Sequence, residues 1–197
     1  MSQLLREFYE LCPDDMCTLL TEDDKKMNEQ GFLMLAGKVQ QADTKNGNGR
    51  KYPEKILRRE IEKYQTLVQE SRAIGECDHP ESSVINLKNV SHTVTRIWWE
   101  GDAVMAKIKV LPTPSGQIIK ALVQSGIKLG ISSRGVGSTH QSNGITMVDD
   151  DFQLICFDLV SEPSTPGAFM MKEARDRLVK NEKNQRLNEI FNKIVNG

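Results

Sequence analysis

The 197-residue chain has few cysteines and histidines and no long run of apolar residues. Its four cysteines, Cys12, Cys17, Cys77 and Cys156, are scattered, and no basic segment followed by an apolar one opens the chain. We therefore expect thiols in a reducing compartment, without disulfide bridges or a signal peptide. No apolar run approaches the roughly 20 residues that a membrane-spanning helix needs. These absences argue against a disulfide-stapled secreted domain and predict a soluble intracellular protein.

An excess of charge of one sign is also missing. Lys and Arg number 26 against 27 Asp and Glu, which gives a net charge of -1. Nothing therefore attracts the chain as a whole to nucleic acid or to an acidic membrane, and we expect neither as a partner. The composition, 38% hydrophobic and 27% charged, is typical of a soluble globular protein and not of a disordered or fibrous one. The length suits one domain, and no internal repeat at a fixed period is present.

The residue pattern divides the chain into an acidic segment, a central domain and a charged helix. Residues 1–30 carry eight acidic residues against three basic ones, which predicts a loosely attached segment. Residues 31–170 alternate strand-like runs with two connecting helices that begin at Pro53 and Pro114. Residues 171–197 read as a charge-rich helix. The predominance of short strands favours an α+β domain, namely a small, bent β-barrel with helices packed outside.

Strand-like runs bounded by turn residues fill most of the central domain. The stretch "AIGECDHP" predicts a short strand stopped by Pro80, which places His79 at the strand's end. The stretch "LGISSRGVGS", residues 129–138, carries two serines and an arginine between glycines and is typical of a tight turn. The other predicted strands are "GFLMLAGKVQQAD", two runs around the hairpin turn Glu100-Gly101-Asp102, "GITMV" and "FQLICFDLV".

The serine pair supports nucleophilic catalysis only if a base lies within reach. Serine is a weak nucleophile at neutral pH, so it needs a neighbouring base and usually a third group that orients the base. His79 is the candidate base, because a side chain at a strand end can face a cleft. Ser132 follows it after a hairpin and a helix that can bring the two together. Asp158 is the candidate third group, since a carboxylate inside an apolar strand is costly without a partner. Another histidine in that role stays open.

The residues after Ser132 are candidates for the supporting part of such a site. Flanking glycines let the backbone approach a substrate carbonyl and aim N–H groups at a developing oxyanion. We therefore predict an oxyanion- or substrate-supporting role for Ser133, Arg134 and Gly135, with the Arg134 guanidinium ordering the hole or binding an acidic side chain. The structural alternative is a turn with idle hydroxyls and a solvated Arg134.

Two other kinds of site fit the sequence less well. A zinc site built from Cys77 and His79 with Cys12, Cys17 and His92 lacks any paired C-x-x-C or H-x-x-x-H spacing. A phosphate-binding loop at "SSRGVGS" lacks the Gly-Lys-Ser/Thr of a P-loop, and the G-x-G-x-x-G fingerprint is absent. We therefore expect neither a metal nor another cofactor.

Five motifs in a fixed order connect the chain with a known family. In sequence order, "NGNGRKYPEKIL", "GECDHP", "RIWWEGD", "GISSRGVGS" and "FDLVSEPSTPGA" together resemble the prohead core protein proteases of T-even-type tailed bacteriophages. The resemblance spans about residues 31–170 and implies a distant relation to the herpesvirus assembly proteases, whose fold is a small β-barrel wrapped by helices. It also implies that His79 is the general base, that Ser132 and not Ser133 is the nucleophile, and that Asp158 is the third member.

The resemblance implies a biological role as well. Such an enzyme is a serine endopeptidase made as an inactive precursor in the scaffold core of the immature capsid, in the host cytoplasm. It cleaves scaffold, core, capsid and vertex proteins and processes itself. Cleavage follows glutamate with an aliphatic residue two positions before it, so self-cleavage is expected after Glu189, and after Glu22 or Glu7. Arg134 and Arg96 are candidates for a cationic pocket that takes the substrate glutamate. The competing hypothesis is a non-catalytic structural or scaffold subunit with the same fold, and self-association into a homo-oligomer stays open.

Overall fold

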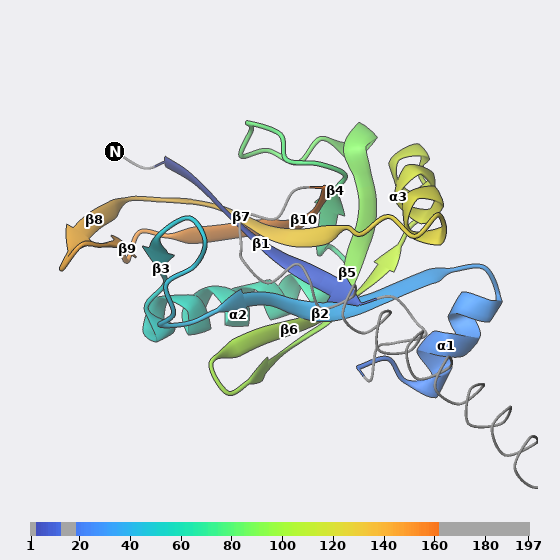
Figure 1. Ribbon diagram of the computed structural model, residues 1–197, viewed down its shortest axis with the longest axis horizontal. Coiled ribbons are helices and arrows are strands. Elements are labelled where there is room, and N and C mark those ends of the chain that lie inside the picture. Colours follow the sequence, from blue (N-terminus) through green and yellow to red (C-terminus); the bar gives the residue numbers. More distant parts are fainter. Residues whose placement is uncertain (1–2, 13–18, 162–197) are drawn as a thin grey trace, which may run out of the picture. The chain divides into compact units, whose positions relative to one another are not determined.

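Strands dominate the part of the chain that the computed structural model describes, residues 3–12 and 19–161 (Figure 1). All of these residues belong to one compact unit, Met1–Pro166. The strands are β1 (Gln3–Cys12), β2 (Leu33–Gln41), β3 (Arg50–Lys51), β4 (Ile74–Glu76), β5 (Val90–Glu100), β6 (Ala103–Val110), β7 (Gly130–Gly137), β8 (Thr139–Ser142), β9 (Ile145–Val148) and β10 (Gln153–Val160).

These strands form two sheets of different size. The larger sheet has seven strands in the order β10-β7-β1-β2-β6-β5-β4, and the smaller has three in the order β3-β9-β8. The hairpin predicted around Gly101 is confirmed as β5 and β6, and Gly101 takes the left-handed backbone conformation that such a turn needs (φ +61°). The strand predictions for "GITMV" and "FQLICFDLV" are confirmed as β9 and β10.

In the described part of the chain, three α-helices accompany the sheets: α1 (Glu22–Glu29), α2 (Glu54–Gln69) and α3 (Pro114–Gln124). The predicted start signals are confirmed, because α2 follows Pro53 directly and Pro114 opens α3. Figure 1 shows α2 along the strands and α3 beside β5, and both helices contact β5. No helix in the described part of the chain is long and apolar enough to cross a membrane.

The main core lies between α2 and the strands of the larger sheet. Residues of α2 at helical spacing of three or four turn one apolar face toward the sheet. Alternate residues of β2, β6 and β10 supply the opposite side. The largest fully buried members of this core include Tyr52, Leu57, Ile61, Tyr64, Ile108, Ile131, Phe152, Phe157 and Leu159.

The N-terminal segment is part of the sheet, which contradicts the loose attachment expected from its acidic composition. Strand β1 runs antiparallel to β7 from Gln3 to Glu10 and also pairs with β2. The Glu7 side chain is 1% exposed, and Arg50 lies 3.0 Å from its carboxylate. Tyr52 and Asn48 also donate hydrogen bonds to this carboxylate. Composition misled here because it counts a buried, paired acid in the same way as a solvated one.

The predicted mixed class of helices and sheets is confirmed. The predicted closed barrel is not confirmed, because the larger sheet is open. A barrel requires hydrogen bonding between its first and last strands along their length. In the described residues, the edge strands β4 and β10 meet through one bridge, between Cys77 and Leu159, and through a 2.7 Å hydrogen bond from the Asp78 N–H to the Leu159 carbonyl. Strand β4 has three residues and is too short to form a full ladder.

The stretch "LGISSRGVGS" forms strand β7 in the interior of the larger sheet, and the prediction of a tight turn is wrong. Strand β7 pairs with β1 on one side and with β10 on the other. Its glycines allow close packing, since a Cβ at Gly135 would lie 2.4 Å from the Phe152 ring and 2.7 Å from the Gln153 carbonyl oxygen. Glycine in a strand marks such close approaches as well as turns, and one sequence does not separate the two cases.

Candidate active site

Ser132 lies on β7 directly opposite Asp158 on β10. The two residues are register partners in the antiparallel β7–β10 ladder, so their side chains lie on the same face of the sheet. Side chains alternate between the faces along a strand, so Arg134 shares this face and Ser133 lies on the other. Ser132 is 2% exposed and Asp158 is 0% exposed.

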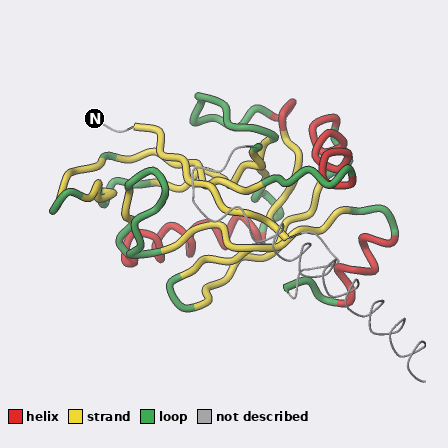
Figure 2. Tube along the Cα trace, viewed as in Figure 1, coloured by secondary structure: helices red, strands yellow, loops and turns green. Residues whose placement is uncertain are grey.

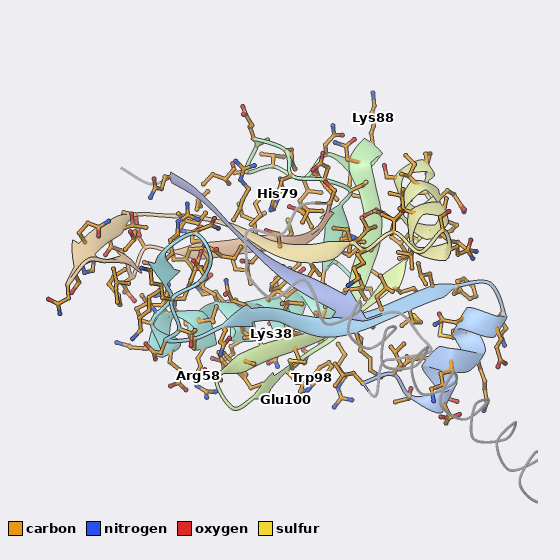
Figure 3. All side chains as sticks on the ribbon, in the orientation of Figure 1. Lys38, Arg58, His79, Lys88, Trp98 and Glu100 are labelled. Carbon is orange, nitrogen blue, oxygen red and sulfur yellow. The ribbon has the colours of Figure 1, made fainter. Side chains whose placement is uncertain are left out.

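His79 reaches this face from the turn that follows β4. Asp78 adopts a left-handed backbone conformation (φ +69°), which aspartate tolerates better than most residues. The Asp78 side chain accepts a 2.8 Å hydrogen bond from the His79 N–H, and the Asp78 N–H bonds to the Leu159 carbonyl. The turn therefore fixes the backbone of His79 beside β10, next to Asp158. In Figure 3 the His79 label lies next to β10.

The three side chains form a continuous chain of hydrogen bonds. The Ser132 Oγ lies 2.5 Å from His79 Nε2, and His79 Nδ1 lies 3.0 Å from Asp158 Oδ2. An ionised carboxylate only accepts hydrogen bonds, so His79 carries its proton on Nδ1 and Nε2 is free to accept from the serine hydroxyl. The His79 side chain is 16% exposed and is the part of the trio most open to solvent. The arrangement has the geometry of an activated nucleophile, its base and an orienting acid.

Asp158 is held as a carboxylate despite its burial. Burial by itself raises the pKa of the carboxyl group, whereas the hydrogen bond with His79, the positive charge of Arg134 and the Glu76 N–H lower it. The lowering effects prevail, so the pKa of Asp158 lies below its ordinary value. The Glu76 N–H donates a 3.0 Å hydrogen bond to Asp158 Oδ1.

Arg134 packs behind Asp158 and does not face solvent. Its side chain is 0% exposed, and Nη2 donates a 3.1 Å hydrogen bond to Asp158 Oδ1. Its Nε lies 2.8 Å from Asp158 Oδ2, an ion-pair contact that lacks the angle of a hydrogen bond. A further hydrogen bond of 2.7 Å runs from Nη1 to the Ser82 carbonyl oxygen. This placement argues against the predicted substrate-supporting role of the Arg134 side chain.

Comparison with known proteins agrees with this geometry. Residues 11–177 match the sequence profile of the family described as prohead core protein serine protease. The chain belongs to this family of peptide hydrolases. It is 30% identical over 162 residues to the prohead core protein protease of Enterobacteria phage T4, covering 80% of this chain and 76% of that protein. The fold also matches the solved structure of the bacteriophage T4 capsid assembly protease, with a TM-score of 0.69 and 26% identity over 82% of this chain and 99% of that one.

The resemblance inferred from the five sequence motifs is therefore confirmed at the level of the family. Ser133 and Gly135, predicted to support an oxyanion hole, follow Ser132 on β7. The Ser133 side chain is 1% exposed, and its Oγ accepts a 2.9 Å hydrogen bond from Gln40 on β2. Strand β7 is paired along both edges, so its N–H groups are engaged by the two ladders. This pairing argues against a hole built from these N–H groups.

The other histidines of the protease lie outside the Ser132 trio. The His92 ring is fully buried, where Nε2 contacts the Phe157 carbonyl oxygen at 3.0 Å and Nδ1 contacts Ser91 Oγ at 2.9 Å. Burial lowers the pKa of His92 to about 4, so the ring is neutral at neutral pH. His140 is exposed and pairs with Asp149 at 2.5 Å. Asp158, and neither of these histidines, therefore contacts His79 Nδ1.

The residues weighed for a zinc site do not assemble into one in the described chain. Among residues 3–12 and 19–161, no group of three or more His, Cys, Asp or Glu side chains is placed to hold a metal ion. Burial, followed by the negative charge of Asp78, raises the pKa of the half-buried Cys77 thiol. Cys17 lies outside the described residues.

Two further groups of predicted residues lie apart from the trio. The Arg96 guanidinium lies 5.1 Å from the Trp98 ring on β5, and no hydrogen bond or ion pair among the described residues joins it to Ser132. Of the predicted self-cleavage positions, Glu7 is buried in β1, and Glu22 is the exposed first residue of α1. Glu189, with the C-terminal helix predicted over 171–197, lies outside the described residues.

Sequence reasoning missed two buried residues beside the trio. The Cys156 thiol donates a 3.3 Å hydrogen bond to Asp158 Oδ1 and accepts one of 3.1 Å from Arg134 Nη2. Glu76 is 0% exposed, and its Oε1 lies 3.5 Å from Arg134 Nη2. The spacing of two between Cys156 and Asp158 on a strand was a usable signal, because it places both on one face. No comparable signal pointed to Glu76.

Proposed function

We propose that the chain is a serine endopeptidase of the phage prohead core, with Ser132 as the nucleophile, His79 as the general base and Asp158 as the orienting acid. The observation that carries this proposal is the pair of contacts at His79, 2.5 Å to Ser132 Oγ and 3.0 Å to Asp158 Oδ2, in a member of a serine protease family. These contacts meet the distance that a base needs to remove a serine proton.

The reaction follows from the direction of these hydrogen bonds. Ser132 Oγ attacks the carbonyl carbon of the scissile peptide bond while its proton passes to His79 Nε2. The tetrahedral intermediate collapses when His79 returns the proton to the leaving amine, and an acyl ester on Ser132 remains. Water, activated in turn by His79, hydrolyses that ester and restores the serine. Asp158 keeps the Nδ1 proton in place and stabilises the imidazolium that forms in each half of the reaction.

The substrates that we propose are the proteins of the immature capsid. The two T4 relatives are named for the prohead core and for capsid assembly. We therefore propose cleavage of scaffold, core, capsid and vertex proteins inside the prohead, in the host cytoplasm. Cleavage after glutamate, and kinship with the herpesvirus assembly proteases, rest on the motif resemblance alone.

Self-processing is part of the proposal, and the fold ranks its positions. Glu7 lies in a strand that is paired on both sides, so cleavage after it requires β1 to leave the sheet. Cleavage after Glu22 requires the first turn of α1 to unwind, because Thr21 and Asp24 form a capping box there. Glu189 lies outside the described residues, and cleavage after it is proposed from the motif resemblance alone.

The test is a matched pair of serine variants. Full-length Ser132→Ala and Ser133→Ala are compared with the unmodified chain for cleavage of a prohead scaffold fragment and for change of their own mass. Ser132→Ala abolishes cleavage, whereas Ser133→Ala retains it, because Ser133 faces Gln40 and not His79. Cleavage by both variants would reject the serine mechanism, and no cleavage by the unmodified chain would favour the structural-subunit hypothesis. Mass analysis of the fragments shows whether each cut follows a glutamate.

A further inference from the structure

Arg134 connects three separate parts of the candidate active site. Its guanidinium contacts both carboxylate oxygens of Asp158, Nη2 at 3.1 Å and Nε at 2.8 Å. The same Nη2 donates to Cys156 Sγ at 3.1 Å and lies 3.5 Å from Glu76 Oε1. Nη1 donates at 2.7 Å to the carbonyl oxygen of Ser82. A fully buried arginine with these partners is fixed in one orientation, and so are the groups that it contacts.

The position of Arg134 on the strand ties these contacts to the nucleophile. Arg134 follows Ser132 by two residues on β7, so both side chains project from the same face of one strand. Strand β7 is paired with neighbours on both sides, which makes it a rigid element. The geometry of β7 therefore sets the distance between Ser132 and Arg134, which lies behind Asp158. Asp158 is held from one side by His79 and from the other by Arg134.

The loop between β4 and β5 depends on the same guanidinium. Figure 2 shows this segment as a loop that ends, directly before β5, in one short helical turn, Leu87–Asn89. Its apolar residues Val84 and Leu87 are 72% and 75% exposed, so little hydrophobic burial holds it in place. Polar contacts contribute instead, and two of them come from the site: Arg134 binds the Ser82 carbonyl, and Glu76 Oε1 accepts a short hydrogen bond from the Asn86 N–H. His79 lies in this same loop.

We propose that Arg134 is a positioning residue of the catalytic site, which holds the Asp158 carboxylate against His79 Nδ1 and pins the loop that follows His79. This inference rests on the proposed function, because it gives Arg134 a role only if the trio is catalytic. The Arg134 side chain is 0% exposed and its contacts are with Asp158, Cys156, Glu76 and the Ser82 carbonyl, so it acts through Asp158 and the loop. A lysine would keep the charge but would lose the planar fork that reaches Asp158, Cys156 and Ser82 together.

A double-mutant cycle separates positioning from general structural support. The full-length chain is prepared as Arg134→Met, Asp158→Asn and the double variant. Arg134→Met lowers kcat on the order of 10²-fold, as expected for a displaced catalytic group. KM stays nearly unchanged, because the Arg134 side chain is 0% exposed and does not contact substrate. In the Asp158→Asn background, the same substitution changes the rate of Ser132 labelling by a fluorophosphonate by less than about threefold. The rate of fluorophosphonate labelling is measured in all four proteins. The proposal would be overturned if Arg134→Met lowered this rate by the same factor with Asp158 and with Asn at position 158.

A second readout addresses the His79–Asp158 contact directly. Proton NMR of the unmodified chain is expected to show a strongly deshielded Nδ1 proton for His79, which His79→Gln removes. Arg134→Met shifts this signal upfield or broadens it, and Arg134→Lys gives an intermediate spectrum with intermediate kcat. An unchanged signal in Arg134→Met that remains folded would overturn the proposal. If Arg134→Met does not fold, Arg134→Lys decides the question by the same signal, because it keeps the buried charge.

Matched controls distinguish the failure of this inference from the failure of the proposed function. Arg59→Met removes an arginine that pairs with Glu60 and Asp150, away from the trio, and it keeps most of the activity. Ser132→Ala tests the proposed function alone. Cleavage by Ser132→Ala would remove the basis of both proposals. If Ser132→Ala is inactive but the effects of Arg134→Met and Asp158→Asn are additive, only the role of Arg134 is rejected.

Discussion

Ser132 and Asp158 are cross-strand partners, and this register relationship places the proposed nucleophile and the proposed acid on one face of the sheet. A shift of one residue in the β7–β10 ladder would turn Asp158 toward the core and bring Phe157 to the active-site face. The ladder contains an irregularity between Leu154 and Cys156, two to four residues before Asp158. The register at the site is therefore fixed by local strand geometry, and His79 closes the gap between the two side chains from a separate turn.

Asp158→Asn is expected to lower kcat on the order of 10³- to 10⁴-fold with little change in KM. The amide cannot hold the Nδ1 proton of His79 in the productive tautomer, since its NH₂ group would donate toward Nδ1. Steady-state kinetics on a scaffold fragment checks this. Gln40→Met is the control, because Gln40 contacts Ser133 and not Ser132, and it retains most of kcat. A similar loss in both variants would contradict a specific role for the aspartate.

The free energy of unfolding is expected to rise with pH between about 4 and 6.5 because of His92. Burial lowers the pKa of His92 to about 4 in the folded chain, whereas an unfolded histidine titrates near 6.5. Between these values the unfolded chain binds a proton that the folded chain does not, so stability falls as the pH is lowered through this window. The full difference corresponds to about 3 kcal/mol. Urea unfolding at several pH values checks it, and His92→Gln is expected to flatten the slope.

Parts of the fold and of the site were predictable from the sequence, because their local residue patterns fit only one structural explanation. Pro53 and Pro114 marked helix starts correctly, since proline fits a first turn and little else in a helix. Asp158 stood out because a carboxylate in an apolar strand needs a partner. The stretch around Ser132 was misread because its glycines serve close packing against Phe152, and glycine also marks turns.

The role of Arg134 was not predictable from the sequence, because nothing local distinguishes a buried arginine from a solvated one. Its partners come from β10, from the β4 end and from the loop at Ser82, which are distant in the chain. The same holds for Glu7, whose counter-charge Arg50 is supplied by another strand. Long-range pairing decides the burial of charged groups, and a single sequence carries little record of it.

Gly135→Ala is expected to lower the free energy of unfolding by about 1–3 kcal/mol, the usual cost of overpacking. The added Cβ would lie 2.4 Å from the Phe152 ring, and the backbone of β7 must shift to relieve the contact. Because Ser132 is on the same strand, kcat falls as well. Urea unfolding and kinetics check both effects. Gly144→Ala is the matched control, since a Cβ there meets nothing within 4 Å and only its left-handed conformation carries a cost.

The left-handed conformation of Asp78 predicts opposite results for two substitutions. Asp78→Gly keeps most of the activity, because glycine adopts φ +69° without strain and keeps the N–H bond to the Leu159 carbonyl, although the side-chain bond to the His79 N–H is lost. Asp78→Val places a β-branched residue there at a cost of roughly 1–3 kcal/mol and rotates the His79 backbone away from β10. Kinetics measured well below the melting temperature of each variant separates misplacement of His79 from unfolding. Equal activity of the two variants would show that this turn does not position His79.

Glu7→Gln is expected to destabilise the fold by about 2–4 kcal/mol, toward the lower end of the range for breaking a buried ion pair because Arg50 is 23% exposed. The amide keeps the shape of the side chain but leaves the Arg50 charge without its partner, and β1 is then held less firmly against β7. Glu22→Gln, an exposed acid in the same segment, changes stability by no more than about 0.5 kcal/mol. Thermal unfolding of the two variants checks the difference. Similar small effects would mean that the N-terminal segment contributes little to the fold, as its composition alone predicted.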